Sequence, residues 1–126
     1  MLPICVQDTG KYGRGIFATR DITNGELIEQ SPVIVSAESE WKYLKKTILH
    51  DYCFSWGEDY ELTALALGYG SLFNHSYSPN VMYIYNMDNQ TIDFYAIADI
   101  QMGEEITINY NDDSEDKSPL WFDVLE

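Results

Sequence analysis

Short apolar runs separated by turn-forming residues are the feature that most constrains the fold of this chain. Glycine, asparagine and proline interrupt the apolar runs along most of the sequence, and the Asn24-Gly25 pair is a strong turn signal. Runs this short suit strands, whereas a helix needs a longer amphipathic segment. The pattern predicts a mainly β fold with one or two short helices.

The expected strands follow from the apolar runs and the turns between them. Pro32 interrupts one run and predicts a bent or edge strand, because proline cannot donate to a sheet ladder. Asp88 and Asn89 lie between two runs and predict a hairpin. The expected strand segments are Ile4–Val6, Ile16–Ala18, Leu27–Val35, Val81–Tyr85, Ile92–Ile97 and Glu105–Tyr110.

Two segments have features of helices. In the segment 36–52, Trp41, Leu44 and Ile48 recur at helical spacing, and Ser39 is the expected N-cap. The segment 62–72 is apolar and contains Gly68 and Gly70, so we expect one or two helical turns that end at glycine.

Length and charge limit the function classes. With 126 residues, the chain is expected to form a single domain, 1–126. The formal net charge is −14, which argues against nucleic acid or an anionic membrane as the main partner, because both are bound by Lys and Arg. The charge favours a cationic partner, and the alternative is that it only maintains solubility.

Metal ligands and targeting signals are sparse. Cys5, Cys53, His50 and His75 have no established zinc spacing apart from the loose His50/Cys53 separation, so we predict no metal site. The acidic residues after position 111 lack the pattern of a calcium loop. We see no signal peptide and no apolar run long enough to span a membrane. The expected localisation is soluble and intracellular, with nucleus or cytoplasm undetermined.

One short pattern occurs twice. The segment Asp21–Glu26 resembles the segment Asp99–Glu104, and each begins with Asp-Ile and ends with Gly-Glu. A common strand-turn-strand arrangement used twice explains the likeness. One repetition of the pattern is not enough to indicate a repeat protein.

Two polar segments could carry chemistry. Gly13-Arg14-Gly15 is not followed by the helix that a dinucleotide fingerprint needs. Its glycines either let the backbone approach a ligand closely or form a plain turn. Asn74 and His75 directly follow the apolar Leu72-Phe73 pair and should lie at the edge of the core. Their polar groups need partners there, and could bind each other or a polar ligand.

Taken in order, three motifs resemble those of the SET-domain protein lysine methyltransferases. The segments are 13–18, then 73–76 with Pro79-Asn80, then 103–110, similar to the family patterns G-x-G, N-H-S-x-x-P-N and G-E-E-[LI]-T-x-x-Y. The likeness covers nearly the whole chain and is greatest to the small stand-alone viral SET histone methyltransferases. Zinc-binding segments that flank this domain in many relatives, before or after it, are not seen in the sequence.

The resemblance implies a fold, a cofactor and a substrate. The fold would consist of small curved sheets with a threaded, pseudoknot-like C-terminal segment beside the Asn74-His75 motif, a rare exception to unthreaded chains. S-adenosyl-L-methionine would be the methyl donor and a protein lysine the acceptor. The two would enter from opposite faces through a narrow channel.

The resemblance also assigns candidate site residues. Tyr110 corresponds to the catalytic tyrosine, and Tyr52 to a catalytic-site tyrosine of the lysine channel. Tyr83 and Ile108 are further candidates for the channel, and Ile108, which has no hydroxyl, suggests room for higher methylation. The candidate cofactor-binding residues are Gly13, Arg14, Gly15, Asn74, His75 and Trp121.

Partner and activity leave alternatives open. The leading hypothesis is methylation of a basic protein, with a histone tail as the natural substrate, or else a ribosomal or DNA-associated protein. The other hypothesis is a SET-like module that binds basic peptides without turnover. No direct nucleic-acid or membrane partner is expected, and the smallest relatives in the family suggest a homodimer.

Overall fold

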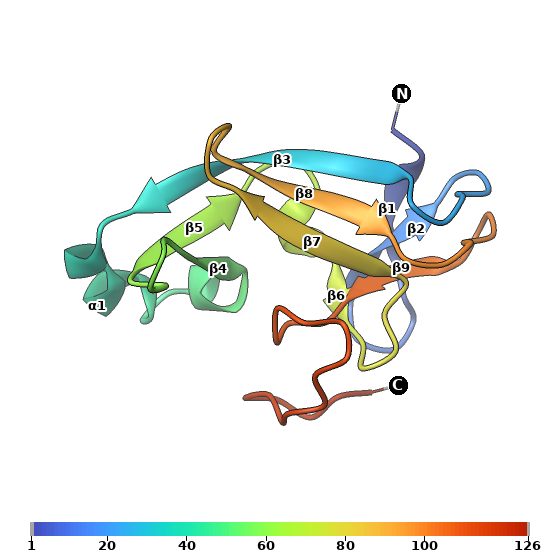
Figure 1. Cartoon of the computed structure of the whole chain (residues 1–126). Coiled ribbons are helices and arrows are strands. Elements are labelled where there is room, and N and C mark those ends of the chain that lie inside the picture. Colours follow the sequence, from blue (N-terminus) through green and yellow to red (C-terminus); the bar gives the residue numbers. More distant parts are fainter. Residues whose placement is uncertain (1, 126) are drawn as a thin grey trace.

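The computed structural model describes residues 2–125 and contains two curved sheets (Figure 1). The smaller sheet has the strand order β1-β2-β9-β6, in which β6 runs parallel to β9 and the other pairs are antiparallel. Its strands are β1 (Ile4–Asp8), β2 (Arg14–Ala18), β6 (Asn74–His75) and β9 (Glu105–Ile108).

The larger sheet is antiparallel and has the strand order β4-β5-β3-β8-β7. Its members are β3 (Leu27–Ser36), β4 (Cys53–Trp56), β5 (Leu62–Ala66), β7 (Val81–Asn86) and β8 (Thr91–Ala96). The predicted hairpin is confirmed, because β7 and β8 pair along their whole length across the Asp88-Asn89 turn. The predicted mainly β fold is also confirmed.

Pro32 lies in the interior of the larger sheet, so the expectation of an edge strand is wrong. Residues 27–32 of β3 pair with β8, and residues 33–36 pair with β5. Pro32 therefore lies where the strand changes its partner, and its carbonyl accepts the Leu67 N–H at 2.8 Å. A bulge between Leu27 and Glu29 bends the strand near its start.

The segment 36–52 is helical only in short pieces. It consists of the 3-10 helix η1 (Glu38–Glu40), α1 (Trp41–Leu44) and the 3-10 helix η2 (Ile48–Asp51). Ser39 is not an N-cap, because Ala37 and Glu40 occupy the N-cap positions of η1 and α1. Among the described residues, no helix is long and apolar enough to cross a membrane.

Residues 62–66 of the segment 62–72 are extended, so the helical prediction is wrong for this part. Residues 62–66 form β5, which has a ladder partner on both sides, and this pairing overrides the ambiguous apolar pattern. Ala64 and Ala66 alternate inward and are 0% and 4% exposed. The only helical turn of the segment is η3 (Gly70–Leu72), which begins at glycine instead of ending there.

Isoleucine and aromatic side chains fill the core. Ile92, Phe94 and Ala96 share the inner face of β8, whereas Ala98 lies beyond the strand and is exposed. Ile106 and Ile108 face the core from β9.

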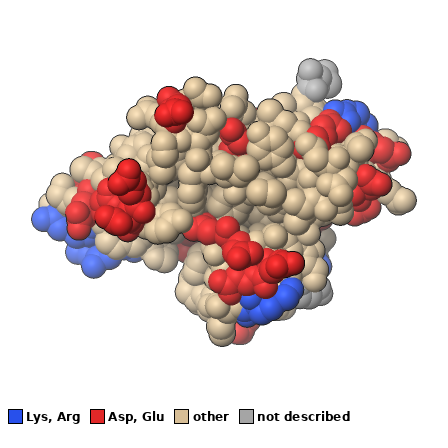
Figure 2. Space-filling view, viewed as in Figure 1, with Lys and Arg blue, Asp and Glu red and all other residues tan. Residues whose placement is uncertain are grey.

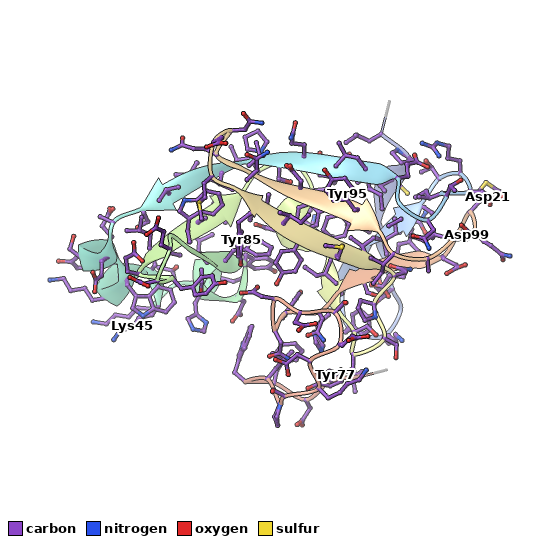
Figure 3. The ribbon with its side chains drawn as sticks, viewed as in Figure 1. Asp21, Lys45, Tyr77, Tyr85, Tyr95 and Asp99 are labelled. Carbon is purple, nitrogen blue, oxygen red and sulfur yellow. The ribbon has the colours of Figure 1, made fainter. Side chains whose placement is uncertain are left out.

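The two copies of the repeated pattern pair with each other. Ile22 and Ile100 form an isolated antiparallel bridge, and each N–H donates to the other carbonyl at 2.8 Å. The two segments thus join an early and a late part of the chain at one end of the molecule, where Figure 3 shows Asp21 and Asp99 close together.

The aspartates repeat this symmetry. Asp21 Oδ1 accepts the Met102 N–H at 2.9 Å, and Asp99 Oδ1 accepts the Asn24 N–H at 2.9 Å. Each turn is therefore closed by the carboxylate of the other copy.

The paired segments predict a stability effect. Ile100 is 1% exposed, so Ile100→Ala should lower the free energy of unfolding by about 2–5 kcal/mol through the cavity it leaves. Chemical denaturation measures this change. Met102→Ala in the same turn, where the side chain is 68% exposed, should change it by about 0.5 kcal/mol or less. Equal effects of the two substitutions would contradict the burial of this bridge.

Candidate active site

Two cavities meet at the C-terminal end of β9. The tyrosine pocket has a volume of about 170 Å³, and the tail pocket has a volume of about 420 Å³. The tyrosine pocket is lined by Asp51, Tyr52, Cys53, Phe54, Ser55, Gly70, Ser71, Phe73, Tyr83, Tyr110, Asp112 and Trp121. The tail pocket is lined by Tyr12, Asp51, Tyr52, Asn74, His75, Tyr110 and residues 121–125. They share Asp51, Tyr52, Tyr110 and Trp121.

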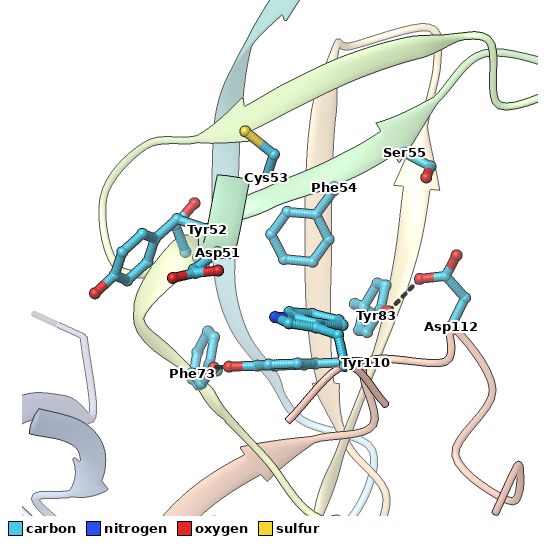
Figure 4. A pocket seen from close by; sticks show the side chains of 12 residues that line it. Asp51, Tyr52, Cys53, Phe54, Ser55, Phe73, Tyr83, Tyr110 and Asp112 are labelled. Atoms are coloured by element: carbon cyan, nitrogen blue, oxygen red, sulfur yellow. Dashed lines mark hydrogen bonds between the residues drawn. The ribbon is translucent and has the colours of Figure 1, made fainter. Parts of the chain in front are cut away.

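Tyr110 is fixed at the junction by two hydrogen bonds. Its hydroxyl donates to the Phe73 carbonyl at 2.7 Å (Figure 4). Its backbone N–H donates to His75 Nδ1 at 2.9 Å. Burial raises the pKa of this phenol, and the neighbouring Tyr52, Glu105 and Asp51 raise it further. Tyr110 is therefore a neutral hydroxyl with a fixed orientation at neutral pH.

Asn74 lines the tail pocket and connects three segments of the chain there. Its side-chain Nδ2 donates to the Arg14 carbonyl and to Glu105 Oε2, each at 2.9 Å. Glu105 Oε1 accepts the Tyr12 hydroxyl. A Cβ on Gly15 would lie 2.6 Å from Glu105 Oε2 and 2.7 Å from Asn74 Nδ2, so only glycine leaves room for this network.

The other two residues of the glycine motif lie outside the pockets. Gly13 and Arg14 are exposed and line neither cavity, although the Arg14 carbonyl contributes to the Asn74 network. Gly13 has a φ of +91°, which a side chain tolerates poorly, and open space around its Cα. Tyr12 is the residue that this turn brings into the wall of the tail pocket.

Tyr83 faces the tyrosine pocket and packs there. Its hydroxyl donates to the Asp112 carboxylate, and the Tyr85 hydroxyl donates to the same oxygen at 3.0 Å. Phe54 meets the Tyr83 ring edge to face at 5.4 Å between centroids. Burial raises the pKa of both tyrosines, and the Asp112 charge raises it further, so both hydroxyls remain donors.

Ile108, a candidate channel residue, lies in the core beside the site. Its side chain is 1% exposed, belongs to the core and lines neither pocket. Side chains alternate along β9, so Ile106 and Ile108 face the core together. Tyr110 lies beyond the end of the strand, where the chain turns toward the pockets.

The C-terminal segment brings two aromatic rings to the site. Trp121 stacks on Tyr110 with 6.1 Å between centroids and 16° between planes, and it lines both pockets while 58% exposed. Phe122 meets His75 edge to face at 6.3 Å.

Several pocket residues were not predicted as site residues from the sequence. These residues are Tyr12, Asp51, Phe54, Phe73 and Asp112. Tyr12 and Phe73 each directly precede a motif residue, which is the signal that could have indicated them.

The family of the chain follows from these motifs and from a direct match. The SET-domain family model matches residues 13–111, which include the Asn74-His75 motif and Tyr110. The chain belongs to the SET-domain family. The predicted SET fold of small curved sheets is confirmed, and its threaded C-terminal segment stays a prediction. The Asn80 side chain bonds the Glu105 carbonyl and the Thr107 N–H, both at 2.9 Å.

Relatives of this SET domain include histone methyltransferases. A histone-lysine N-methyltransferase of Schizosaccharomyces pombe, specific for lysine 37 of histone H3, is 36% identical over 122 residues, covering 96% of this chain and 78% of the relative. The crystal structure of a candidate histone methyltransferase of Plasmodium falciparum is 30% identical, with a TM-score of 0.66, covering 87% of this chain and 94% of that one. The predicted enzyme class, protein lysine methyltransferase, is confirmed by these relatives.

A more distant structure shares the fold. The Polycomb Repressive Complex 2 of Chaetomium thermophilum, bound to S-adenosylmethionine, has a TM-score of 0.73 and is 23% identical, covering 88% of this chain and 15% of that one.

The Asn74 network predicts an effect on the tail pocket. Gly15→Ala should force Asn74 and Glu105 apart, lower stability by about 1–3 kcal/mol and weaken S-adenosylmethionine binding by about tenfold or more. Calorimetric titration and thermal unfolding measure the two effects.

Gly25→Ala is the matched control, because Gly25 has a φ of +91° and lines neither pocket. It strains the backbone, but its Cβ meets no atom within 4 Å. Stability should fall by about 1–2 kcal/mol, while cofactor affinity remains close to that of the unmodified chain. An equal loss of affinity in both variants would contradict the role assigned to the Asn74 network.

Proposed function

We propose that this SET-domain chain transfers a methyl group from S-adenosylmethionine to the ε-amine of a lysine in a basic protein, with a histone tail as the first substrate to test. The observation that carries the proposal is the junction of the two pockets at Tyr110. One pocket suits a nucleoside-sized ligand and the other an extended side chain. Their common wall contains Tyr110, whose hydroxyl donates to the Phe73 carbonyl at 2.7 Å.

The tail pocket fits the methyl donor. Its volume of about 420 Å³ lies within the range of small-molecule sites. Tyr12, Trp121 and Phe122 offer aromatic faces for a base, and Asp51 offers a carboxylate to a cation. Asn74 Nδ2 donates to the Arg14 carbonyl and to Glu105, and the amide oxygen can accept a hydrogen bond. When bound, S-adenosylmethionine supplies a methyl group on a positively charged sulfonium.

The tyrosine pocket would hold the lysine side chain. Phe54, Phe73 and Tyr83 provide aromatic walls, which attract a cationic side chain and exclude water. Exclusion of water disfavours the charged amine and lowers its pKa from about 10.4. The amine would lose its proton to solvent, and its lone pair would then take the methyl group as the carbon–sulfur bond of the donor breaks and a neutral thioether is left.

Tyr110 would position the amine. Its proton is donated to the Phe73 carbonyl, so its oxygen can accept a hydrogen bond from the neutral amine at the junction. Tyr52, which is 37% exposed and lines both pockets, forms the neighbouring wall. The protein thus contributes alignment and a preorganised polar group.

Surface charge supports a basic substrate. The net charge is −14, and Figure 2 shows several clusters of acidic side chains on the visible face, with smaller areas of basic ones. Such a field attracts Lys- and Arg-rich proteins and repels nucleic acid. A ribosomal or DNA-associated protein is the other substrate class.

Finer assignments belong to the proposal. Gly13, Arg14 and Gly15 would shape the cofactor site through the backbone, and Trp121 would cover it. The likeness to the small viral SET proteins and the homodimer remain predictions.

Tyr110→Phe tests the proposed function. It removes the fixed hydroxyl, and we expect kcat to fall by roughly 10²–10³-fold while cofactor affinity changes little. Mass spectrometry after incubation with S-adenosylmethionine, core histones and ribosomal proteins measures methylated lysines.

Tyr43→Phe is the control, because Tyr43 is 65% exposed and lines none of the pockets of the site. An unchanged rate in Tyr110→Phe would refute the role of Tyr110. Cofactor binding without methylation of any protein in the pool would favour the module that binds without turnover.

The raised pKa of Tyr110 predicts the shape of the pH profile. A phenol whose pKa is raised above about 10 stays neutral to higher pH. The rate should therefore rise with pH as the lysine loses its proton, without a decline from Tyr110 ionisation up to about pH 10. A decline between about pH 8 and 9.5 that disappears in Tyr110→Phe would be inconsistent with a neutral phenol.

A further inference from the structure

Asp112 lines two cavities at once. The side cavity, of about 230 Å³, is adjacent to the tyrosine pocket and is lined by Val81, Met82, Tyr83, Asn109, Asp112, Asp113 and Ser114. The tyrosine pocket and the side cavity share Tyr83 and Asp112. These two side chains therefore form the partition between them.

The partition lies at the end of the tyrosine pocket that is remote from the tail pocket. Figure 4 shows Asp112 on the opposite side of the pocket from Asp51 and Tyr52. Asp51 and Tyr52 also line the tail pocket, whereas Asp112 does not. A lysine with its amine at Tyr110 would bring residues next to it in the substrate close to this partition.

The Asp112 carboxylate is oriented with one oxygen available. The Tyr83 and Tyr85 hydroxyls both donate to Oδ1. No hydrogen bond from a described residue reaches Oδ2. The carboxylate is thus fixed by two protein donors and retains capacity for a third. The side cavity adds the apolar Val81 and Met82, against which an alkyl stem can pack.

We propose that Asp112 is a specificity-determining residue that binds a second basic side chain of the substrate, an arginine or lysine near the target lysine, seated in the side cavity. The inference rests on the proposed function. A guanidinium or ammonium matches the free carboxylate oxygen, and charge-assisted hydrogen bonds of this kind are stronger than neutral ones.

A purely structural role is the competing explanation. Asp112 could serve only to hold Tyr83 and Tyr85 in place. Asp112→Asn separates the two, because asparagine keeps an oxygen that accepts the tyrosine hydroxyls and removes the negative charge. If the role of Asp112 is only structural, Asp112→Asn should not change the preference among substrates that differ only in charge.

The test uses peptides of histone H3 sequence around one lysine, with arginine or citrulline at each neighbouring position on either side. Citrulline has the shape of arginine without its charge. The unmodified chain should prefer arginine to citrulline by roughly 3- to 10-fold in kcat/KM at one of these positions. The difference should lie mainly in KM and decrease with salt. In Asp112→Asn the ratio of the two rates should fall to about 1.

Glu115→Gln is the matched control. It removes one negative charge from the same exposed segment, and Glu115 lines none of the described cavities of the site. The arginine preference should persist in this variant, which separates a local contact from the overall field. Thermal unfolding checks that Asp112→Asn remains folded.

Calorimetric titration of the same peptides in the presence of S-adenosylhomocysteine gives a second measurement. The inference is overturned if Asp112→Asn keeps the full arginine preference, or if the unmodified chain shows none at any position. Absence of methylation of every peptide would count against the proposed function. In that case the binding ratio of arginine to citrulline peptides still decides the role of Asp112.

Discussion

The parallel pairing of β6 with β9 is the interaction on which the rest of the site depends. It places Asn74 beside Thr107 and His75 beside Ile108, and the Ser76 N–H extends the ladder to the Ile108 carbonyl at 2.9 Å. A ladder this short would not be stable alone. The hydrogen bonds from Tyr110 to His75 and Phe73 continue it past the end of β9. Through these contacts, the pairing of β6 with β9 fixes the orientation of the Tyr110 side chain.

Carboxylates organise much of what surrounds Tyr110. Glu105 joins Tyr12 to Asn74, and Asp112 joins Tyr83 to Tyr85. In each case a negative group accepts two donors, and such bonds are stronger than neutral ones. An acidic composition therefore serves the interior of the site as well as its surface.

The apolar runs and turns were sufficient to predict β1, β2, β3, β7, β8 and β9, and the motifs indicated Asn74, His75 and Tyr110. Alternation in β8 and the Asp88-Asn89 turn are local signals, so the hairpin could be predicted. The strand at 62–66 could not be predicted, because this segment, β5, becomes a strand through its pairing with β3. The family resemblance made Ile108 a channel candidate, whereas strand alternation buries its side chain in the core beside Ile106. Asp112 has no local signal, since its importance comes from hydroxyls on β7.

The bridge between Ile22 and Ile100 has a consequence for the order in which the molecule can form. Both sheets also combine early and late strands, since β2 pairs with β9 and β3 pairs with β8. Contacts between segments so far apart in the chain carry a large loop-closure entropy, and such topologies fold slowly. During synthesis, the first half leaves the ribosome without its partners. Folding of this domain is therefore expected to be completed only after translation has passed β9.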